Sequence, residues 1–100
     1  MTIYVSHIFQ GKQENLERAK KIIHDLQVKD LENCYICPLL TFSYLGYGEI
    51  GYEEEMQLCE DLLVLCDKLI VASGLSEGVE REISLAEKCN MEIEYLEDTE

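Results

Sequence analysis

The chain has 100 residues, of which 21 are acidic and 8 basic, so its net charge is −13 at pH 7. Nucleic acids bind basic surfaces, so this charge argues against a nucleic-acid polymer as a partner. No apolar run approaches the roughly 20 residues needed to span a bilayer, so we expect no membrane partner. The length predicts a single domain over residues 1–100. So short a chain buries a limited core, which places any ligand site at an edge or between subunits.

The five cysteines and an N-terminus without secretion-signal organisation predict reduced thiols and a cytoplasmic protein. Cys34 and Cys37 have the CxxC spacing, but no second cluster of that spacing accompanies them. The run around them is apolar and rich in β-formers. We interpret both as buried strand cysteines, with metal or redox use as the alternative. We therefore expect no metal and no cofactor.

The first half of the chain alternates strand and helix patterns. Residues 2–6, TIYVS, predict a buried strand. Residues 11–27 predict a helix with apolar side chains at helical spacing. These side chains are Leu16, Ala19, Ile23 and Leu26. Residues 33–38, NCYICP, predict a second strand that ends at its proline, and residues 39–45 a short helical turn. Residues 46–51 contain three glycines and predict a loop.

The second half continues the alternation. Residues 52–66 predict a long helix, and residues 68–73, KLIVAS, a third buried strand. A loop over residues 74–78 leads to a last helix over residues 79–89. Its apolar stripe comprises Val79, Ile83, Ala86 and, less regularly, Cys89. Residues 91–97, MEIEYLE, alternate apolar and acidic residues and predict an edge strand with one solvated face.

This order predicts an α/β fold: a three-layer, doubly wound sandwich with a mostly parallel four-stranded sheet, strand order 2-1-3-4, flavodoxin/Rossmann-like. In such sheets, ligands bind beyond the carboxyl ends of the strands, where the strand order reverses. The loops at that edge are residues 6–12, 38–51 and 72–78. Glu82 lies one turn into the helix after the third loop, on or beside its apolar stripe. We expect its carboxylate to face the crevice, or else to accept a hydrogen bond from a buried tyrosine.

Other polar residues in these loops have two interpretations each. Ser6 and His7 either contact a ligand such as a phosphate or lie at the surface. Gly11 either offers backbone N–H groups to a phosphate or is an ordinary helix start. Ser76 and Gly78 either hold a phosphate or ribose or serve as an N-cap and a turn.

The tyrosines of the glycine-rich segment, Tyr44, Tyr47 and Tyr52, are candidates for stacking on a base. The same segment could instead be a lid or a subunit contact.

Several motifs, taken in order, resemble the nucleoside 2-deoxyribosyltransferase superfamily and its small phage and bacterial relatives. They are IYVSHIF at 3–9, Gly11 with Asn15, Pro38-Leu39, Leu58-Cys59, Leu62-Leu63, CDKLIVAS at 66–73 and SEGVERE at 76–82. The resemblance implies that Glu82 is the nucleophile and attacks the anomeric carbon of a nucleoside, and that a base or water completes the turnover. It implies that Tyr4 lines the site and holds the glutamate or the sugar.

The candidate ligand-binding residues are Ser6, His7, Phe9, Gly11, Pro38, Tyr47, Ser73, Ser76 and Gly78. The resemblance also implies a homo-oligomer, because the family's sites are commonly closed by a neighbouring subunit. The tyrosine-rich loop and the acidic residues 94–100 are the candidates to reach across.

The chain departs from the family at the position of a catalytic acid. Counting eight residues back from Asp67 reaches Cys59, while Glu60 and Asp61 point to other faces of the helix. The predicted function is therefore cleavage or transfer at the N-glycosidic bond of a nucleoside or nucleotide. The alternative is a non-catalytic binder that sequesters or senses a nucleotide signal, related to ADP-ribose or a cyclic nucleotide. A third reading is a structural protein with a vestigial crevice.

Overall fold

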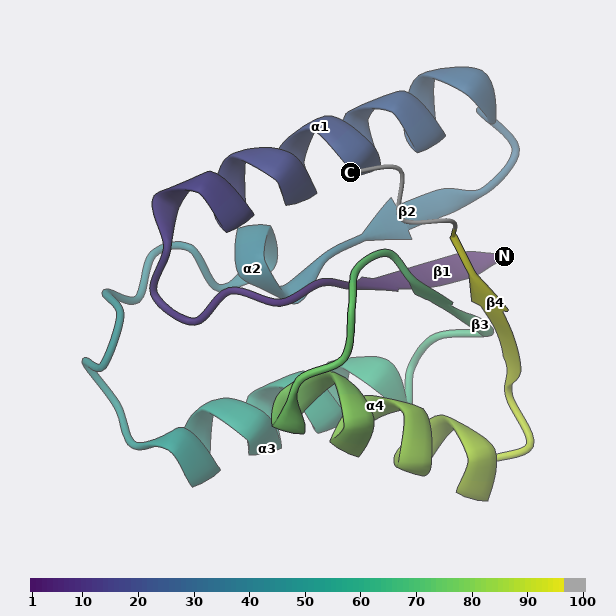
Figure 1. The fold of residues 1–100 in the computed structure, drawn as a ribbon. Helices are drawn as coiled ribbons and strands as arrows, with labels where there is room; N and C mark the ends of the chain where they lie inside the picture. The colour runs from purple at the N-terminus through teal and green to yellow at the C-terminus, as the bar shows by residue number, and fades with distance from the viewer. Residues whose placement is uncertain (97–100) are drawn as a thin grey trace.

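The computed structural model describes residues 1–96 and shows a four-stranded, all-parallel sheet between two helical layers (Figure 1). The strands are β1 (Thr2–Ser6), β2 (Cys34–Ile36), β3 (Lys68–Val71) and β4 (Glu92–Tyr95), in the spatial order β2-β1-β3-β4. The helices are α1 (Gln13–Lys29), α2 (Pro38–Thr41), α3 (Tyr52–Leu63) and α4 (Glu77–Lys88). The predicted fold class and strand order are confirmed. Within residues 1–96 no helix combines the length and apolarity that crossing a membrane requires.

The central strand β1 separates two hydrophobic clusters, because successive side chains point to opposite faces of a sheet. Val5 packs with Ala19 and Cys37 on the face covered by α1 and α2 (Figure 1). Tyr4 packs with Leu63 and Val79 on the face covered by α3 and α4. Tyr4 and its next-but-one neighbour Ser6 therefore both face the α3–α4 layer.

The strand order places a topological switch point between β1 and β3. The chain leaves β1 through α1 to reach β2 on one side, and leaves β3 through α4 to reach β4 on the other (Figure 1). Ser6 pairs with Val71 at the carboxyl ends of the two strands. The loops that follow diverge from there, and this divergence opens the crevice in which such folds bind ligands.

The helix expected over residues 52–66 is shorter in the structure and ends at Leu63. The Cys66 N–H donates to the Leu63 carbonyl at 2.9 Å, which tightens the chain into a turn. Asp67 then accepts a hydrogen bond from the Thr2 N–H at 2.8 Å. This tie holds the chain beside β1 where β3 begins, so the helix cannot continue.

Two expectations for cysteines are wrong. The second strand spans Cys34–Ile36 rather than residues 33–38, and Cys34 is exposed at the edge of the sheet, whereas Cys37 is buried. Cys89 does not face inward, because it is the exposed C-cap of α4. All five cysteines are free thiols.

The start of α4 and the limits of β4 also differ from expectation. Helix α4 begins at Glu77, because the Ser76 side chain accepts a hydrogen bond from the Val79 N–H at 3.3 Å. The N-cap interpretation of Ser76 is thus confirmed. Strand β4 spans Glu92–Tyr95 instead of residues 91–97. Residues 97–100, part of the acidic segment expected to reach a neighbouring subunit, lie outside the described residues.

The outer edge of β2 is covered by a side chain of α1. Gln27 Oε1 accepts the Tyr35 N–H at 2.9 Å, and Gln27 Nε2 donates to the carbonyl oxygens of Asn33 at 2.8 Å and Asp30 at 3.0 Å. Gln27 thus satisfies backbone groups that an edge strand would otherwise offer to another chain.

The substitution Gln27→Ala is expected to lower the free energy of unfolding by about 1–3 kcal/mol, because it leaves strand-edge groups unpaired. It is also expected to increase self-association through the uncovered edge. Urea unfolding and light scattering measure the two effects. Gln13→Ala is the matched control, since within residues 1–96 the Gln13 side chain bonds only to the exposed Glu17 on the same helix. Equal stabilities of the two variants would contradict the role of Gln27.

Candidate functional site

A cavity of about 440 Å³ lies at the switch point. Its walls come from the loops after β1 and β3, the segment between α2 and α3, and the helices α2, α3 and α4. Seven of the predicted site residues line it: His7, Phe9, Pro38, Tyr47, Ser76, Gly78 and Glu82. The volume falls within the range of small-molecule sites. The structure therefore brings together residues that are far apart in the chain, from His7 in the loop after β1 to Glu82 in α4.

Glu82 is the central polar group of this cavity. Its side chain is only 5% exposed, and it projects from α4 toward the two hydroxyl groups of β1. Ser6 Oγ donates to Glu82 Oε1 at 2.6 Å, and the Tyr4 hydroxyl donates to Glu82 Oε2. Tyr4 and Ser6 do not line the cavity but lie fully buried beneath it. Both interpretations of Glu82 hold at once, since it bonds a buried tyrosine and also faces the crevice.

Burial and hydrogen bonding act on the Glu82 carboxyl in opposite directions. Burial raises its pKa above the ordinary value, and the hydrogen bonds from Ser6 and Tyr4 oppose that rise. Burial also raises the pKa of Tyr4 far above its usual range, and the charge of Glu82 adds to the effect. Tyr4 is thus a neutral donor at any physiological pH. The two hydroxyls thus favour the ionised form of Glu82, whereas its burial favours the protonated form.

Cys59 of α3 lines the same cavity. Burial, followed by the charge of Glu82, raises the pKa of its thiol to about 12. A thiol with such a pKa stays protonated near neutral pH and is therefore a poor nucleophile there.

An aromatic pair forms one wall of the cavity. The rings of Phe9 and Tyr47 meet edge to face, with centroids 5.5 Å apart. Asn15 Nδ2 donates to the Phe9 carbonyl at 2.8 Å and fixes the loop that carries this ring. Gly11 does not line the cavity; it has φ +70°, and a Cβ there would lie 2.8 Å from Tyr47 Cε2. Gly11 is therefore needed for the close approach of Tyr47.

Of the remaining predicted residues, some line the cavity and others hold its loops in place. His7 is buried and lies with Nδ1 2.7 Å from the Ile8 carbonyl oxygen, to which it donates. The alternative that Ser6 and His7 are surface residues is wrong, because both are buried. Ser73 does not line the cavity; its Oγ accepts the Ile8 N–H at 3.0 Å and ties the loop after β3 to the loop after β1.

Sequence reasoning missed Glu55 and Met56, which line the cavity from α3. The signal for Glu55 was available, because it lies four residues before Cys59 and thus on the same helical face. Arg81 was also missed. Its guanidinium pairs with Glu53 at 2.9 Å and Glu60 at 3.5 Å, which joins α4 to α3 beside the cavity.

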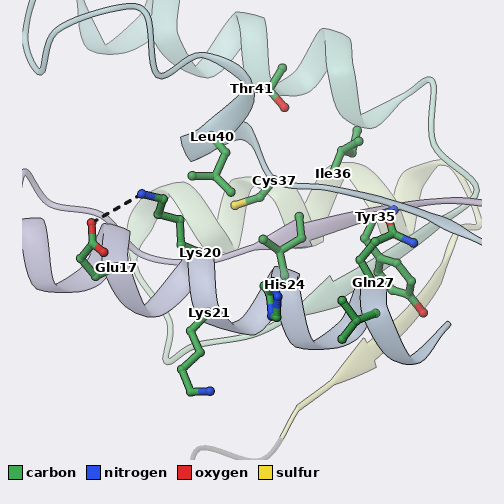
Figure 2. A pocket seen from close by; sticks show the side chains of 12 residues that line it. Glu17, Lys20, Lys21, His24, Gln27, Tyr35, Ile36, Cys37, Leu40 and Thr41 are labelled. Carbon is green, nitrogen blue, oxygen red and sulfur yellow. Dashed lines mark hydrogen bonds and ion pairs between the residues drawn. The ribbon is translucent and has the colours of Figure 1, made fainter. Parts of the chain in front are cut away.

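A larger hollow of about 880 Å³ lies between α1 and the β2–α2 segment (Figure 2). Lys20, Lys21 and His24 rim it, and Lys20 pairs with Glu17 (Figure 2). Its buried titratable group is Cys37, whose thiol pKa is raised by burial to about 11. We place the chemistry in the smaller cavity, because the buried Glu82 lines it, whereas the acidic residue of the larger hollow, Glu17, is exposed. Among residues 1–96, no group of three or more His, Cys, Asp or Glu side chains is arranged to hold a metal ion.

In comparisons with known proteins, no protein family, curated protein or solved structure matches this chain. The fold and the geometry of the cavity therefore carry the functional argument.

The buried carboxyl makes a prediction about stability and pH. Because the pKa of Glu82 is raised in the folded state, the stability that its protonated form contributes is complete below the unfolded pKa of about 4.3. That contribution is lost as pH rises through the folded pKa. The free energy of unfolding of the wild type is thus expected to fall relative to Glu82→Gln as pH increases from about 4 to 8.

Urea unfolding of both proteins across this pH range is the measurement. Glu80→Gln, on the exposed face of α4, controls for the amide substitution itself. A difference between wild type and Glu82→Gln that is constant with pH would contradict the argument.

Proposed function

We propose that the protein cleaves or transfers at the N-glycosidic bond of a nucleoside, with Glu82 as the nucleophile. One observation carries the proposal: a buried carboxylate faces the switch-point cavity and is held by two hydroxyl donors of the central strand. Buried carboxylates of this kind cost stability and are concentrated at functional sites. The resemblance to nucleoside 2-deoxyribosyltransferases supports the same role for Glu82.

In the proposed reaction, a Glu82 oxygen bonds to the anomeric carbon while the bond from that carbon to the base nitrogen breaks. The electron pair of the broken bond leaves with the base. A carboxylate has about four acceptor positions, so the hydrogen bonds from Tyr4 and Ser6 leave lone pairs free to attack. The resulting glycosyl ester is then attacked by water or a second base, which restores the carboxylate.

The charge of the cavity favours a nucleoside over a nucleotide. Three acidic side chains line it, those of Glu55, Glu77 and Glu82, and none of its described lining residues is lysine or arginine. Phosphate recognition uses cationic side chains or helix N-termini. The N-terminus of α4 does border the cavity, but Glu77 in its first turn adds negative charge there. An uncharged sugar and base fit this field better than a phosphorylated ligand.

A second candidate function is a non-catalytic binder that sequesters or senses a nucleotide. The observation in its favour is Cys59, whose protonated thiol occupies the position that matches the family's acid. Without protonation of the leaving base, an enzyme loses a contribution of about 10²–10⁴ in rate.

One panel separates the two functions. The protein is incubated with deoxynucleosides, ribonucleosides, their monophosphates, and cyclic and ADP-ribose-type nucleotides, then filtered. The filtrate and the heat-denatured protein are both analysed by HPLC. We expect free base in the filtrate with nucleosides. A compound that is retained by the protein and released intact on denaturation would establish the binder instead.

Glu82→Gln is expected to retain nucleoside binding and to lower base release by at least about 10³-fold, because the amide cannot form the glycosyl ester. Equilibrium dialysis and HPLC measure the two properties. Glu80→Gln is the matched control and should release base at the wild-type rate, since Glu80 is exposed on the opposite face of α4. Unchanged turnover in Glu82→Gln would refute the proposal.

We further propose that the protein is a homo-oligomer in which the loop that carries Tyr44 and Tyr47 covers the cavity of a neighbouring subunit. Tyr44 and Tyr47 support this, with exposed fractions of 75% and 70%. Sedimentation velocity at about 50 µM, a concentration suited to a moderate interface, should show a species larger than 11.5 kDa. A monomer at that concentration would contradict the proposal.

A further inference from the structure

The main cavity opens beside a second, smaller hollow of about 120 Å³. The two share part of their lining, including Phe9, Tyr47, Cys59 and Glu55. The smaller hollow is otherwise mostly apolar, and Phe42, the C-cap of α2, also lines it. A hollow with aromatic walls suits a flat heterocycle, which stacks on or meets such rings.

Glu55 is the acidic residue common to both hollows. It lies in the first turn of α3, one turn before Cys59, and is partly buried. Its carboxylate makes no hydrogen bond or ion pair with other residues of 1–96, whereas Glu53 and Glu60 of the same helix bind Arg81. The ion pairs between α3 and α4 therefore involve neighbouring acidic residues, and Glu55 is available to a ligand.

The carboxyl groups of Glu55 and Glu82 both influence the pKa of the Cys59 thiol. Burial contributes most to the raised pKa of Cys59, and the charges of Glu82 and, more weakly, Glu55 add to it. All three side chains line the main cavity, so the two carboxyl groups face one binding space. Pairs of carboxyl groups on either side of a scissile bond are the usual arrangement for glycoside cleavage.

We propose that the smaller hollow receives the departing base and that Glu55 is the proton donor to it. This inference rests on the proposed function, because it concerns the same bond and takes Glu82 as the nucleophile. It assigns the missing acid to a residue one helical turn from Cys59.

The two carboxyl groups account for every proton and bond in the reaction. In the reacting form of the enzyme Glu55 carries a proton, and it gives this proton to a ring nitrogen of the base as the glycosidic bond breaks and Glu82 bonds to the anomeric carbon. The base departs neutral and Glu55 becomes a carboxylate. Glu55 then takes a proton from water as the water oxygen bonds to the anomeric carbon and Glu82 is released.

The test compares two leaving groups on wild type, Glu55→Gln and Glu82→Gln. The substrates are nucleosides and the 4-nitrophenyl glycosides of the same sugars, ribose and 2-deoxyribose. Nitrophenolate is a good leaving group and needs no proton to depart, whereas a nucleobase must be protonated as it leaves. Glu55→Gln is expected to slow nucleoside cleavage by about 10²–10⁴-fold and nitrophenyl glycoside cleavage by less than about tenfold. Glu82→Gln should lose both activities, because its role does not depend on the leaving group.

Glu54→Gln, an exposed neighbour in the same turn, is the matched control and should behave as wild type. Glu55→Asp should recover part of the nucleoside activity, since it restores an acid at the same position. Equal losses on both substrates, or no loss, in Glu55→Gln would overturn the proton-donor role while leaving the function intact. A wild type inert on both substrate classes would overturn the function itself.

Discussion

The hydrogen bonds from Tyr4 and Ser6 to Glu82 connect the centre of the sheet to the helix that follows the switch point. They place an acidic side chain where packing would otherwise demand an apolar one. Burial of a carboxylate is unfavourable unless its oxygens are hydrogen-bonded. The two hydroxyls reduce that cost without removing it, because burial still raises the pKa of Glu82. A fold selected for stability alone would place an apolar residue here, and this conflict is typical of functional sites.

The geometry of this link follows from the two-residue period of the central strand. Tyr4 and Ser6 face α4 because they are two positions apart, while Val5 between them packs against the opposite layer. A register shift of one residue would exchange these faces and remove both donors from the carboxylate. The burial of Val5 therefore sets the register that also turns Tyr4 and Ser6 toward Glu82. Folding and assembly of the site depend on the same register.

Much of this arrangement was predictable because it depends on local patterns and on a general rule of parallel sheets. The β-branched runs predicted the strands, and the alternation with helices predicted the order 2-1-3-4 and the crevice beside Glu82. The end of α3 was not predictable from periodicity, since the apolar pattern continues through Cys66. What stops the helix is a contact between Asp67 and Thr2, which are 65 positions apart. The burial of Cys37 and exposure of Cys34 likewise depend on the position of β2 at the sheet edge. The supporting role of Ser73 required the three-dimensional path of the loops.

The position of the second carboxylate bears on how a base would be held. On a helix, residues four apart share a face and are separated by about one 5.4 Å turn along the axis. Moving an acid from position 59 to position 55 therefore moves it toward the N-terminus of α3, where the smaller hollow lies. A donor so displaced would be suited to a ring nitrogen remote from the glycosidic bond rather than to one beside it. Under the proposed function, a thiol at Cys59 and an acid at Glu55 would together orient the leaving base toward the smaller hollow.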